Sequence, residues 1–216
     1  MSTQEKIIKI LQNKYKLKIV REDPFEVLIH VLLSARTKDT TTFPAQKRLL
    51  RKAHDAKGIL NLSTKQIEKL IYPVGFYHQK AKRVKKLAKM FLEKFNGKVP
   101  STKEELMELP GIGPKSASIV LAYGFGKPAI AVDTHVNRIS QRLGWVPKDT
   151  KPEKTQPIIE KLIPENYHIL ANHLLVTFGR DICRPVSPHC FRCPIYADCK
   201  YEKKEFYKIR HNSQKK

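Results

Sequence analysis

The chain has 216 residues, with 42 Lys or Arg against 20 Asp or Glu, so its formal net charge is +22. This excess favours a polyanionic partner, nucleic acid rather than an anionic membrane surface, because no basic amphipathic helix with exposed aromatic residues is evident. A hydrophobic content of 41% is that of a globular protein, and no apolar run approaches the ~20 residues of a membrane span.

Hydrophobic residues recur at three- and four-residue spacing along most of the chain, which predicts helices. The expected helices, in chain order, cover residues 4–14, 24–35, 40–52, 64–71, 78–95, 102–109, 115–123, 134–143, 156–162 and 166–178. Ser101 and Glu104 fit a capping box for the helix at 102–109. No segment alternates as a strand does, and residues 201–216 read as a charged tail that frays.

The connections between these helices are short and contain Pro, Gly or Asn, so no long linker separates independent domains. We therefore expect an all-α protein with two helical lobes that share the chain. One lobe is a contiguous bundle over residues 17–127, and the other joins residues 1–16 to residues 128–216.

Residues 109–117 read Leu-Pro-Gly-Ile-Gly-Pro-Lys-Ser-Ala, a glycine turn between two helices. Gly111 and Gly113 flank Ile112 and let backbone N–H groups approach a ligand with no Cβ in the way. Pro114 suits the first position of the next helix, whose unpaired N–H groups suit a phosphate. An ordinary helix–helix turn is the alternative, but the flanking Leu-Pro and Lys-Ser-Ala favour a helix-hairpin-helix that holds a phosphate backbone.

The four cysteines of the chain lie close together, with spacers of six, two and five residues: Cys183, Cys190, Cys193 and Cys199. Four thiolates converging on one point suit a metal ion or an iron–sulfur cluster. Zinc sites usually carry two CxxC-like pairs, and only one such pair occurs here, so the spacing favours an iron–sulfur cluster. Basic residues surround the thiols and make this loop a candidate for phosphate contact: Arg184, His189 and Arg192.

Lys115 follows the glycine turn, and Asp133 precedes a predicted helix in Ala-Val-Asp-Thr-His. A lysine amine becomes a nucleophile when desolvation or neighbouring positive charge lowers its pKa, but a phosphate contact is the alternative role. Asp133 fits an N-cap worth ~1 kcal/mol, and N-cap hydrogen bonds also keep a carboxylate ionised. Such a carboxylate can stabilise positive charge on a sugar ring. His135 lies beside this pair, where a structural hydrogen bond is the more common role.

Residues 109–145, which contain LPGIGPKSA and AVDTHVNR, resemble the helix-hairpin-helix, Gly/Pro-rich loop and aspartate signature of the endonuclease III family of DNA glycosylases. The cysteine spacing matches that family's [4Fe–4S] loop, and residues 24–39 and 75–83 resemble its earlier DNA-facing segments. The resemblance covers nearly the whole chain. It implies a base excision repair enzyme with a [4Fe–4S] cluster and a groove between the lobes that binds double-stranded DNA.

The resemblance implies Lys115 as the attacking amine and Asp133 as its partner. The damaged base would be flipped out of the duplex, Asp133 would stabilise the sugar cation, and Lys115 would attack C1′, expel the base and form a Schiff base. β-Elimination would then cut the strand 3′ to the abasic site. Glycosylases of this fold without that lysine generally use water, so Lys115 implies a bifunctional glycosylase/AP lyase for oxidised pyrimidines.

The resemblance also places Arg36 and Phe76 where family members fill the gap left by the flipped base. Endonuclease III usually has Gln and Leu there, and Met107 stands where the family often has Glu. Arginine can still bind the edge of the orphan base and phenylalanine can still wedge into the stack, with a core aromatic as the alternative for Phe76. Asp39, alternatively an N-cap, and His135 are the candidates for the base pocket.

Two rival functions stay open from the sequence. A monofunctional mismatch glycosylase, acting on thymine or uracil opposite guanine, would release the base without cutting the strand at the same rate. A non-catalytic iron–sulfur protein would bind DNA and turn over no lesion. We further expect a monomer that stays inside the cell, in the cytoplasm or nucleoid if prokaryotic, because the N-terminus lacks the apolar stretch of a signal peptide.

Overall fold

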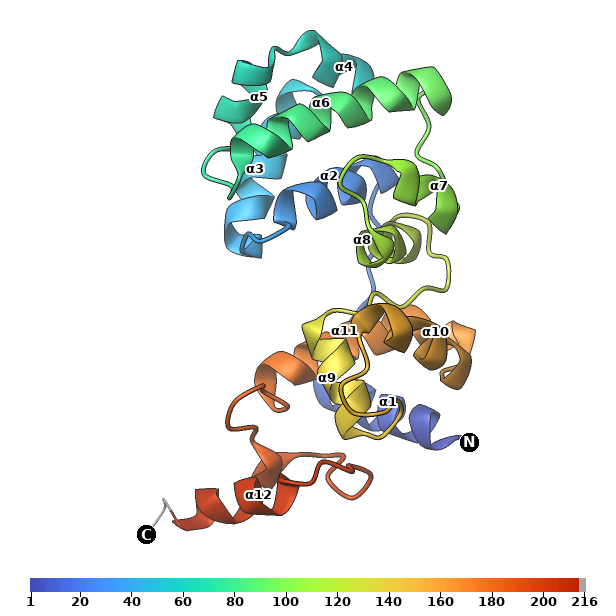
Figure 1. Cartoon of the computed structure of the whole chain (residues 1–216), viewed down its shortest axis with the longest axis vertical. Coiled ribbons are helices and arrows are strands. Elements are labelled where there is room, and N and C mark those ends of the chain that lie inside the picture. The colour runs from blue at the N-terminus through green and yellow to red at the C-terminus, as the bar shows by residue number, and fades with distance from the viewer. Residues whose placement is uncertain (214–216) are drawn as a thin grey trace. The chain divides into compact units, whose positions relative to one another are not determined.

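The computed structural model describes residues 1–213, and these form helices and connecting loops with no β-strand (Figure 1). The expected all-α fold is confirmed. The chain divides into two compact units. Unit 1 joins residues 1–19 to the chain from residue 128 onward, and unit 2 spans residues 20–127. Within the described residues, no helix combines the length and the apolar character needed to cross a bilayer.

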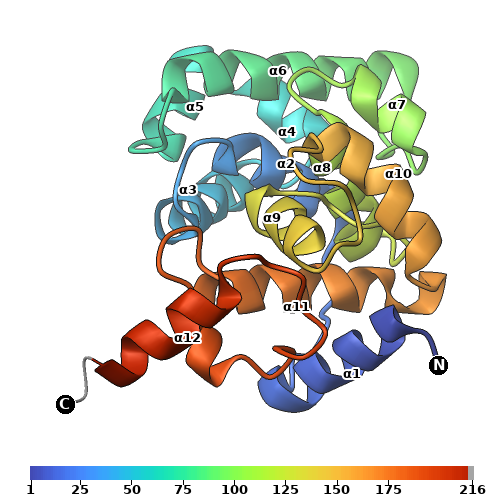
Figure 2. The ribbon, with the colours of Figure 1, turned by 60° about the horizontal axis from the view of Figure 1, so that its bottom comes forward.

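Unit 2 is a helical bundle with one π-helix at its end. Its elements are α2 (Pro24–Ser34), α3 (Asp39–Lys52), α4 (Ala56–Asn61), α5 (Thr64–Ile71), α6 (Tyr77–Lys94), α7 (Lys103–Glu108), α8 (Pro114–Ile119) and the π-helix η1 (Val120–Gly124). The long helix α6 runs across α2, α4 and α5 (Figures 1 and 2). Helix α2 packs on α3, α6, α8 and η1, so it forms the centre of the unit.

Helix α2 is buried on nearly all sides. Its buried side chains are Val27, Leu28, Ile29, Val31, Leu32 and Leu33. A helix that is apolar all round belongs in a core, where its free backbone groups need partners other than water. At the N-terminus, Asp23 Oδ1 accepts hydrogen bonds from the backbone N–H groups of Phe25 (2.9 Å) and Glu26 (3.1 Å), and Pro24 has no N–H to satisfy.

Unit 1 packs around helix α11. Its elements are α1 (Thr3–Tyr15), α9 (Thr134–Arg142), α10 (Pro152–Leu162), the 3-10 turns η2 (Glu165–Tyr167) and η3 (Cys190–Arg192), α11 (His168–Asp181) and α12 (Lys204–Ser213). Helix α11 lies against α1 and α9 (Figure 2). The core between them is made of aliphatic and aromatic side chains that include Ile7, Leu11, Val136, Leu174 and Phe178.

The structure corrects the sequence-based expectation at the C-terminus. Residues 201–216 were expected to fray, but α12 forms from Lys204 to Ser213, and residues 214–216 lie outside the described part. Lys204 Nζ donates to the carbonyl oxygens of Cys199 (2.7 Å) and Tyr196 (3.3 Å). The helix therefore begins at a residue that is bound to the cysteine loop, a contact that charge patterning does not reveal.

Three local expectations also differ from the structure. Helix α4 is absent from the expected helices, because its six residues are too short to show a helical period. The N-cap of α7 is Thr102, whose Oγ1 accepts from the backbone N–H of Glu105 (3.3 Å), one residue later than the expected cap at Ser101. The helix expected at 115–123 is α8 followed by the π-helix η1.

Gly124, the last residue of η1, makes the closest approach between η1 and α2. A Cβ at this glycine would lie 2.9 Å from Pro24 Cα. We expect Gly124→Ala to lower the free energy of unfolding by about 1–3 kcal/mol, because backbone must move to admit the methyl group. At Gly113 an added Cβ meets no atom within 4 Å, so Gly113→Ala should cost below about 1 kcal/mol. Urea unfolding of both variants checks this, and equal losses would contradict it.

Candidate functional site

The glycine turn between α7 and α8 is a tight backbone hairpin. Gly111 has φ +87°, a left-handed conformation that favours glycine. Ile112 is buried, and its N–H donates to the carbonyl oxygen of Leu109 (3.1 Å), which closes the turn. Gly113 is the N-cap of α8 and has open space where a Cβ would point. The hairpin therefore leaves backbone accessible at the start of α8, as a phosphate contact requires.

Arg83 of α6 lies over this hairpin, and sequence reasoning did not single it out. A Cβ at Gly111 would stand 3.3 Å from Arg83 Cδ and 3.7 Å from its Nη1. The residue is exposed, so its guanidinium adds a positive charge beside the glycine turn. The one sequence signal was that residues 75–83 resembled a DNA-facing segment.

Lys115 is the second residue of α8 and is exposed. The small residues that follow it, Ala117 and Ser118, are fully buried and anchor α8 to its unit. The amine therefore stands on a fixed backbone, directly after the hairpin. Lys115 belongs to unit 2 and Asp133 to unit 1.

Asp133 is the N-cap of α9. Its Oδ1 accepts hydrogen bonds from the backbone N–H groups of His135 and Val136, both at 2.8 Å. The residue is half-buried. These two bonds fix the carboxylate at the start of the helix and place it where the helix dipole favours a negative charge. The capping role expected for Asp133 is thus present in the structure.

His135 points into unit 1. A Cβ at Gly179 of α11 would lie 2.7 Å from His135 Nδ1, so the ring packs on that glycine. The same Nδ1 is 3.1 Å from Nη2 of Arg138. Arg138 also donates to the carbonyl oxygens of Cys183 (3.1 and 2.7 Å) and Gly179 (3.3 Å). These contacts favour a structural role for both side chains, since they join α9 to α11 and to the cysteine loop.

Arg36 and Phe76 are brought together within unit 2. Both side chains are exposed, and Arg36 Cζ is 5.9 Å from the centroid of the Phe76 ring. Both residues have positive φ, +55° and +58°, a left-handed conformation that is uncommon for residues other than glycine. The structure excludes the alternative in which Phe76 is a core aromatic, because 54% of it is accessible.

Asp39, a candidate for the base pocket, and Met107, which departs from the family's Glu before the hairpin, are also at the surface. Asp39 is the first residue of α3, where the N-cap is Lys38, so the alternative in which Asp39 caps this helix is wrong. Its Oδ1 is 4.0 Å from Nε2 of His30. Met107 of α7 is 43% exposed, next to the hairpin.

The four cysteines lie around one small apolar cavity in unit 1. Its walls include Cys183, Cys190, Cys193, Cys199, Phe178, Ile182 and Ile195. Burial, together with the charge of the neighbouring thiolates, raises the pKa of Cys190 to about 11 and that of Cys193 to about 12. Thiols bind a metal only as thiolates, so a metal group bound here would have to offset these raised pKa values by its positive charge. No three His, Cys, Asp or Glu side chains of the described residues surround a single ion position.

Arg142, at the end of α9, holds the cysteine loop. Its Nη1 donates to Cys183 Sγ (3.2 Å) and to the carbonyl oxygen of Arg184 (2.8 Å). Its guanidinium lies 4.2 Å from the ring centroid of Tyr201, and its own carbonyl accepts from the N–H of Lys200 (2.8 Å). One residue thereby fixes both ends of the loop and adds positive charge beside a thiol.

The basic residues of the loop differ in their surroundings. Arg184 is exposed, and its Nε donates to the carbonyl oxygen of Arg180 (3.4 Å). Arg192 Nη2 binds Asp181 Oδ1 (2.6 Å) and lies 3.1 Å from His189 Nδ1. Arg192 and His189 are thus engaged with each other within unit 1, and the Arg184 contact uses its Nε.

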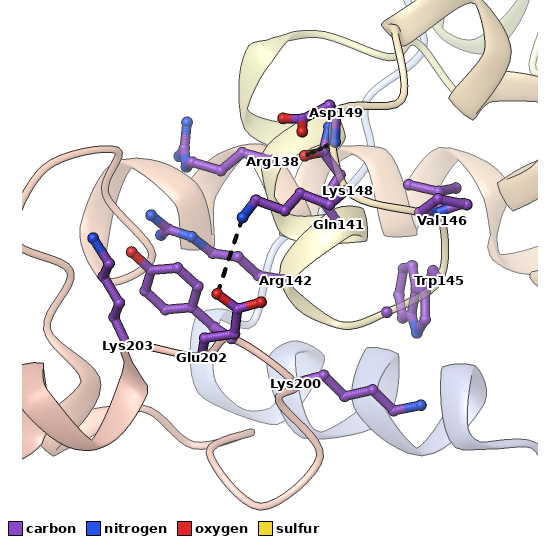
Figure 3. Close-up of a pocket in the computed structure, with 13 residues that line it drawn as sticks. Arg138, Gln141, Arg142, Trp145, Val146, Lys148, Asp149, Lys200, Glu202 and Lys203 are labelled. Atoms are coloured by element: carbon purple, nitrogen blue, oxygen red, sulfur yellow. Dashed lines mark hydrogen bonds and ion pairs between the residues drawn. The ribbon is translucent and has the colours of Figure 1, made fainter.

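A basic pocket of about 690 Å³ lies beside this loop, between the end of α9 and the segment before α12 (Figure 3). Arg138, Gln141 and Arg142 enter it from α9, and Lys200, Glu202 and Lys203 enter it from the other side. Lys148 and Glu202 form an ion pair across it (4.0 Å). Both are well exposed, so this pair contributes little stability.

Known proteins resemble the chain in sequence and in fold. The HhH-GPD superfamily of base excision DNA repair proteins matches residues 29–165. Endonuclease III of Thermotoga maritima is 44% identical over 188 residues, which are 87% of this chain and 85% of the relative. Endonuclease III of Bacillus subtilis is 38% identical over 185 residues, 84% of this chain and 83% of the relative.

Two solved structures illustrate the similarity of fold. A trapped endonuclease III–DNA covalent intermediate, an estranged-adenine complex, has a TM-score of 0.85 and 35% identity, and the match covers 95% of this chain and 100% of the other. A thermostable thymine-DNA glycosylase has a TM-score of 0.85 at 24% identity, with 93% and 97% of the two chains covered. At that identity the second likeness concerns the fold alone.

Substitutions at Asp133 separate its capping role from any chemical role. Asn accepts the same two N–H hydrogen bonds as Asp, so Asp133→Asn should leave the free energy of unfolding within about 0.5 kcal/mol of wild type, whereas Asp133→Ala should cost about 1 kcal/mol. Denaturant unfolding measures both. A large loss in Asp133→Asn would mean that the charge itself holds the helix start.

Proposed function

The chain belongs to the HhH-GPD superfamily of base excision DNA repair proteins and, within it, to the endonuclease III family, and on this premise we propose that it removes oxidised pyrimidines from double-stranded DNA with Lys115 as its nucleophile. Endonuclease III proteins are DNA glycosylase/AP lyases, so the protein is a bifunctional enzyme of base excision repair. The lesion class and the role of each residue are the parts that we propose.

The exposed amine directly after the hairpin is the observation that carries the proposal. Phosphate contacts at Gly111, Gly113 and Arg83 would hold the backbone of the damaged strand beside Lys115. The similarity to a trapped covalent endonuclease III–DNA intermediate supports a mechanism with a covalent step. A lysine that served only as a phosphate contact would not need a rigid helix start, since a phosphate tolerates a mobile ammonium.

The proposed reaction has two stages. In the first, the unprotonated Lys115 Nζ attacks C1′, the bond from C1′ to the base breaks, and the base leaves with the electron pair and takes up a proton. In the second, the sugar ring opens to a Schiff base, a proton leaves C2′, and the bond from C3′ to oxygen breaks. Water then hydrolyses the Schiff base and frees the amine. Asp133 stabilises the positive charge on the sugar in the first stage.

We assign Arg36 and Phe76 to the gap that the flipped base leaves. The exposed phenyl ring would wedge into the base stack, and the guanidinium beside it would bind the edge of the orphan base. Asp39 and His135 stay the candidates for contact with the flipped base, and the inward position of the His135 ring makes Asp39 the better candidate. The enzyme would act inside the cell, because its substrate is DNA. We also expect it to act as a monomer.

Cys183, Cys190, Cys193 and Cys199 would hold a [4Fe–4S] cluster. When bound, the cluster supplies four metal–thiolate links that close the loop. Arg142 would then donate to a ligating thiolate, and the exposed Arg184 would contact a phosphate. The cluster is therefore structural in this proposal, and the chemistry on DNA belongs to Lys115 and Asp133.

Borohydride trapping tests the amine mechanism. Borohydride reduces a Schiff base to a stable amine, so wild-type protein should be covalently linked to a duplex that carries one abasic site, and Lys115→Ala should give no link. Asp133→Asn should release base from a single defined oxidised pyrimidine more slowly, on the order of 10²–10⁴-fold. Gel mobility of the linked complex and a timed assay of base release provide the two measurements.

Lys57→Ala is the matched control for trapping, because Lys57 is an exposed lysine on α4. It should trap as wild type does. Trapping that survives in Lys115→Ala would overturn the assignment of the nucleophile. Base release without strand cutting by wild type would favour the monofunctional mismatch glycosylase, and DNA binding with no release of any base would favour the non-catalytic protein.

Metal analysis tests the cluster. We expect protein purified without oxygen to contain iron and acid-labile sulfide in equal amounts, and Cys193→Ser to lose iron and to unfold at lower denaturant concentration, since few apolar residues hold the loop otherwise. Elemental analysis and a sulfide assay check this. Zinc at one atom per chain with no sulfide would show that the thiols form a zinc site instead.

A further inference from the structure

Lys80 of α6 is a buried lysine whose role the sequence does not indicate. It is 2% exposed, and lysine side chains are seldom buried to this extent unless they have partners. Its neighbours on α6 at positions 82 and 86 are exposed, as expected for a basic helix surface. Such an exception needs a physical explanation.

The ammonium group of Lys80 donates all of its hydrogen bonds to one turn of the chain. Nζ donates to the carbonyl oxygens of Leu33 and Ala35, both at 2.6 Å, and to Thr37 Oγ1 at 3.1 Å. An ammonium has three N–H donors, so each is matched by one acceptor. All three acceptors belong to the end of α2 and the turn that follows it.

The end of α2 explains why a cation belongs there. The last carbonyl groups of a helix have no partner within the helix, and the helix dipole makes this end negative. Helix α2 has no basic residue in its last turn. Lys80 supplies the missing charge from another helix. Burial, and then the charge of Arg83, lower its pKa to about 8, so at neutral pH the amine still carries its proton and all three donors.

Lys80 also joins this turn to the one that precedes α6. Thr37 Oγ1, which accepts from Lys80, also accepts from the backbone N–H of Gly75 (3.2 Å). The backbone N–H of Lys80 donates to the carbonyl oxygen of Phe76 (3.0 Å). A Cβ on Gly75 would lie 3.2 Å from Thr37 Oγ1 and 3.3 Å from the carbonyl oxygen of Arg36. The two turns are therefore in contact, with the ammonium beneath them.

These are the turns that carry Arg36 and Phe76 in their left-handed conformations. We propose that Lys80 is a positioning residue that fixes the two turns to each other, so that Arg36 and Phe76 enter the gap in damaged DNA as one rigid pair. The inference rests on the proposed gap-filling function of these two side chains. The competing explanation is that Lys80 does no more than cap α2 and stabilise the fold.

Binding to a non-cleavable abasic analogue provides the test. A duplex with one tetrahydrofuran site presents a gap but has no base to release, so the measured Kd is independent of Lys115 chemistry. In the wild-type background, Phe76→Ala and Arg36→Ala should each weaken binding on the order of tenfold. In the Lys80→Met background, the same two substitutions should weaken it less than about twofold, because the turns no longer hold the side chains in place. Affinity for undamaged duplex should change by the same factor in both backgrounds, since any lost phosphate attraction does not depend on how the turns are held.

Two further variants keep the test independent of folding. Thr37→Val removes the hydroxyl that links Lys80 to Gly75 but leaves the two carbonyl contacts that cap α2, so it should also reduce the effect of Phe76→Ala. Lys85→Met is the matched control, because Lys85 lies on the same helix and its Nζ donates to the carbonyl oxygen of Leu62 (2.5 Å). It should leave the effect of Phe76→Ala at its full size. Thermal unfolding confirms that each variant is folded.

The outcomes are distinct. If Phe76→Ala weakens binding by the same factor with Lys80, with Lys80→Met and with Thr37→Val, then Lys80 only stabilises the fold and the inference is wrong. If wild type does not prefer the abasic duplex to the undamaged one, the gap-filling assignment fails and the inference fails with it. A failure of borohydride trapping, in contrast, would remove the amine mechanism and leave this result unchanged.

Discussion

The burial of α2 is the constraint on which unit 2 depends. Six of the eleven side chains of this helix are buried, and the N–H and C=O groups at its ends need partners from outside the helix. Asp23 satisfies the N-terminal end, and Lys80 satisfies the C-terminal end from another helix. The first of these ends lies against η1, which continues from the helix that carries Lys115. The second lies beneath Arg36 and Phe76. The functional elements of the unit are thus built at the two ends of one buried helix.

In unit 1, arginine side chains supply the hydrogen-bond partners that free backbone carbonyl groups need. The cysteine loop has little apolar surface, and its backbone carbonyl groups turn toward α9. Arg138 donates to the carbonyl of Cys183, and Arg142 donates to that of Arg184. A planar guanidinium can bind several carbonyl groups at once, which suits a loop that approaches from one side. The single ammonium of Lys80 instead suits the converging carbonyl groups at the end of a helix. In both units, a cation from a neighbouring helix completes backbone hydrogen bonding that the local sequence leaves open.

Much of the fold could be predicted from helical periodicity, and less of the site. Helix α6 was expected at residues 78–95 and is observed at Tyr77–Lys94, because its apolar stripe is long and regular. The role of Lys80 could not be predicted, since spacing along α6 does not show which lysine meets free carbonyl groups at the end of a helix more than 40 residues earlier. Helix α12 was missed for the same reason, because it depends on the contact of Lys204 with the cysteine loop. The hairpin at residues 109–117 and the N-cap at Asp133 were readable because each is local in sequence.

The contacts that hold the turns of Arg36 and Phe76 are made by backbone atoms, Thr37 and Lys80, not by the two side chains that the turns present. The carbonyl groups of Leu33 and Ala35 and the N–H of Gly75 exist whatever side chain stands at positions 36 and 76. An arginine or a phenylalanine can therefore occupy positions where a resembling enzyme has Gln or Leu without changing how the turns are built. In the gap-filling role that we propose, what changes is the size and charge of the group that would enter the DNA. Substitution at these two positions is thus a route by which base preference can diverge while the supporting structure stays the same.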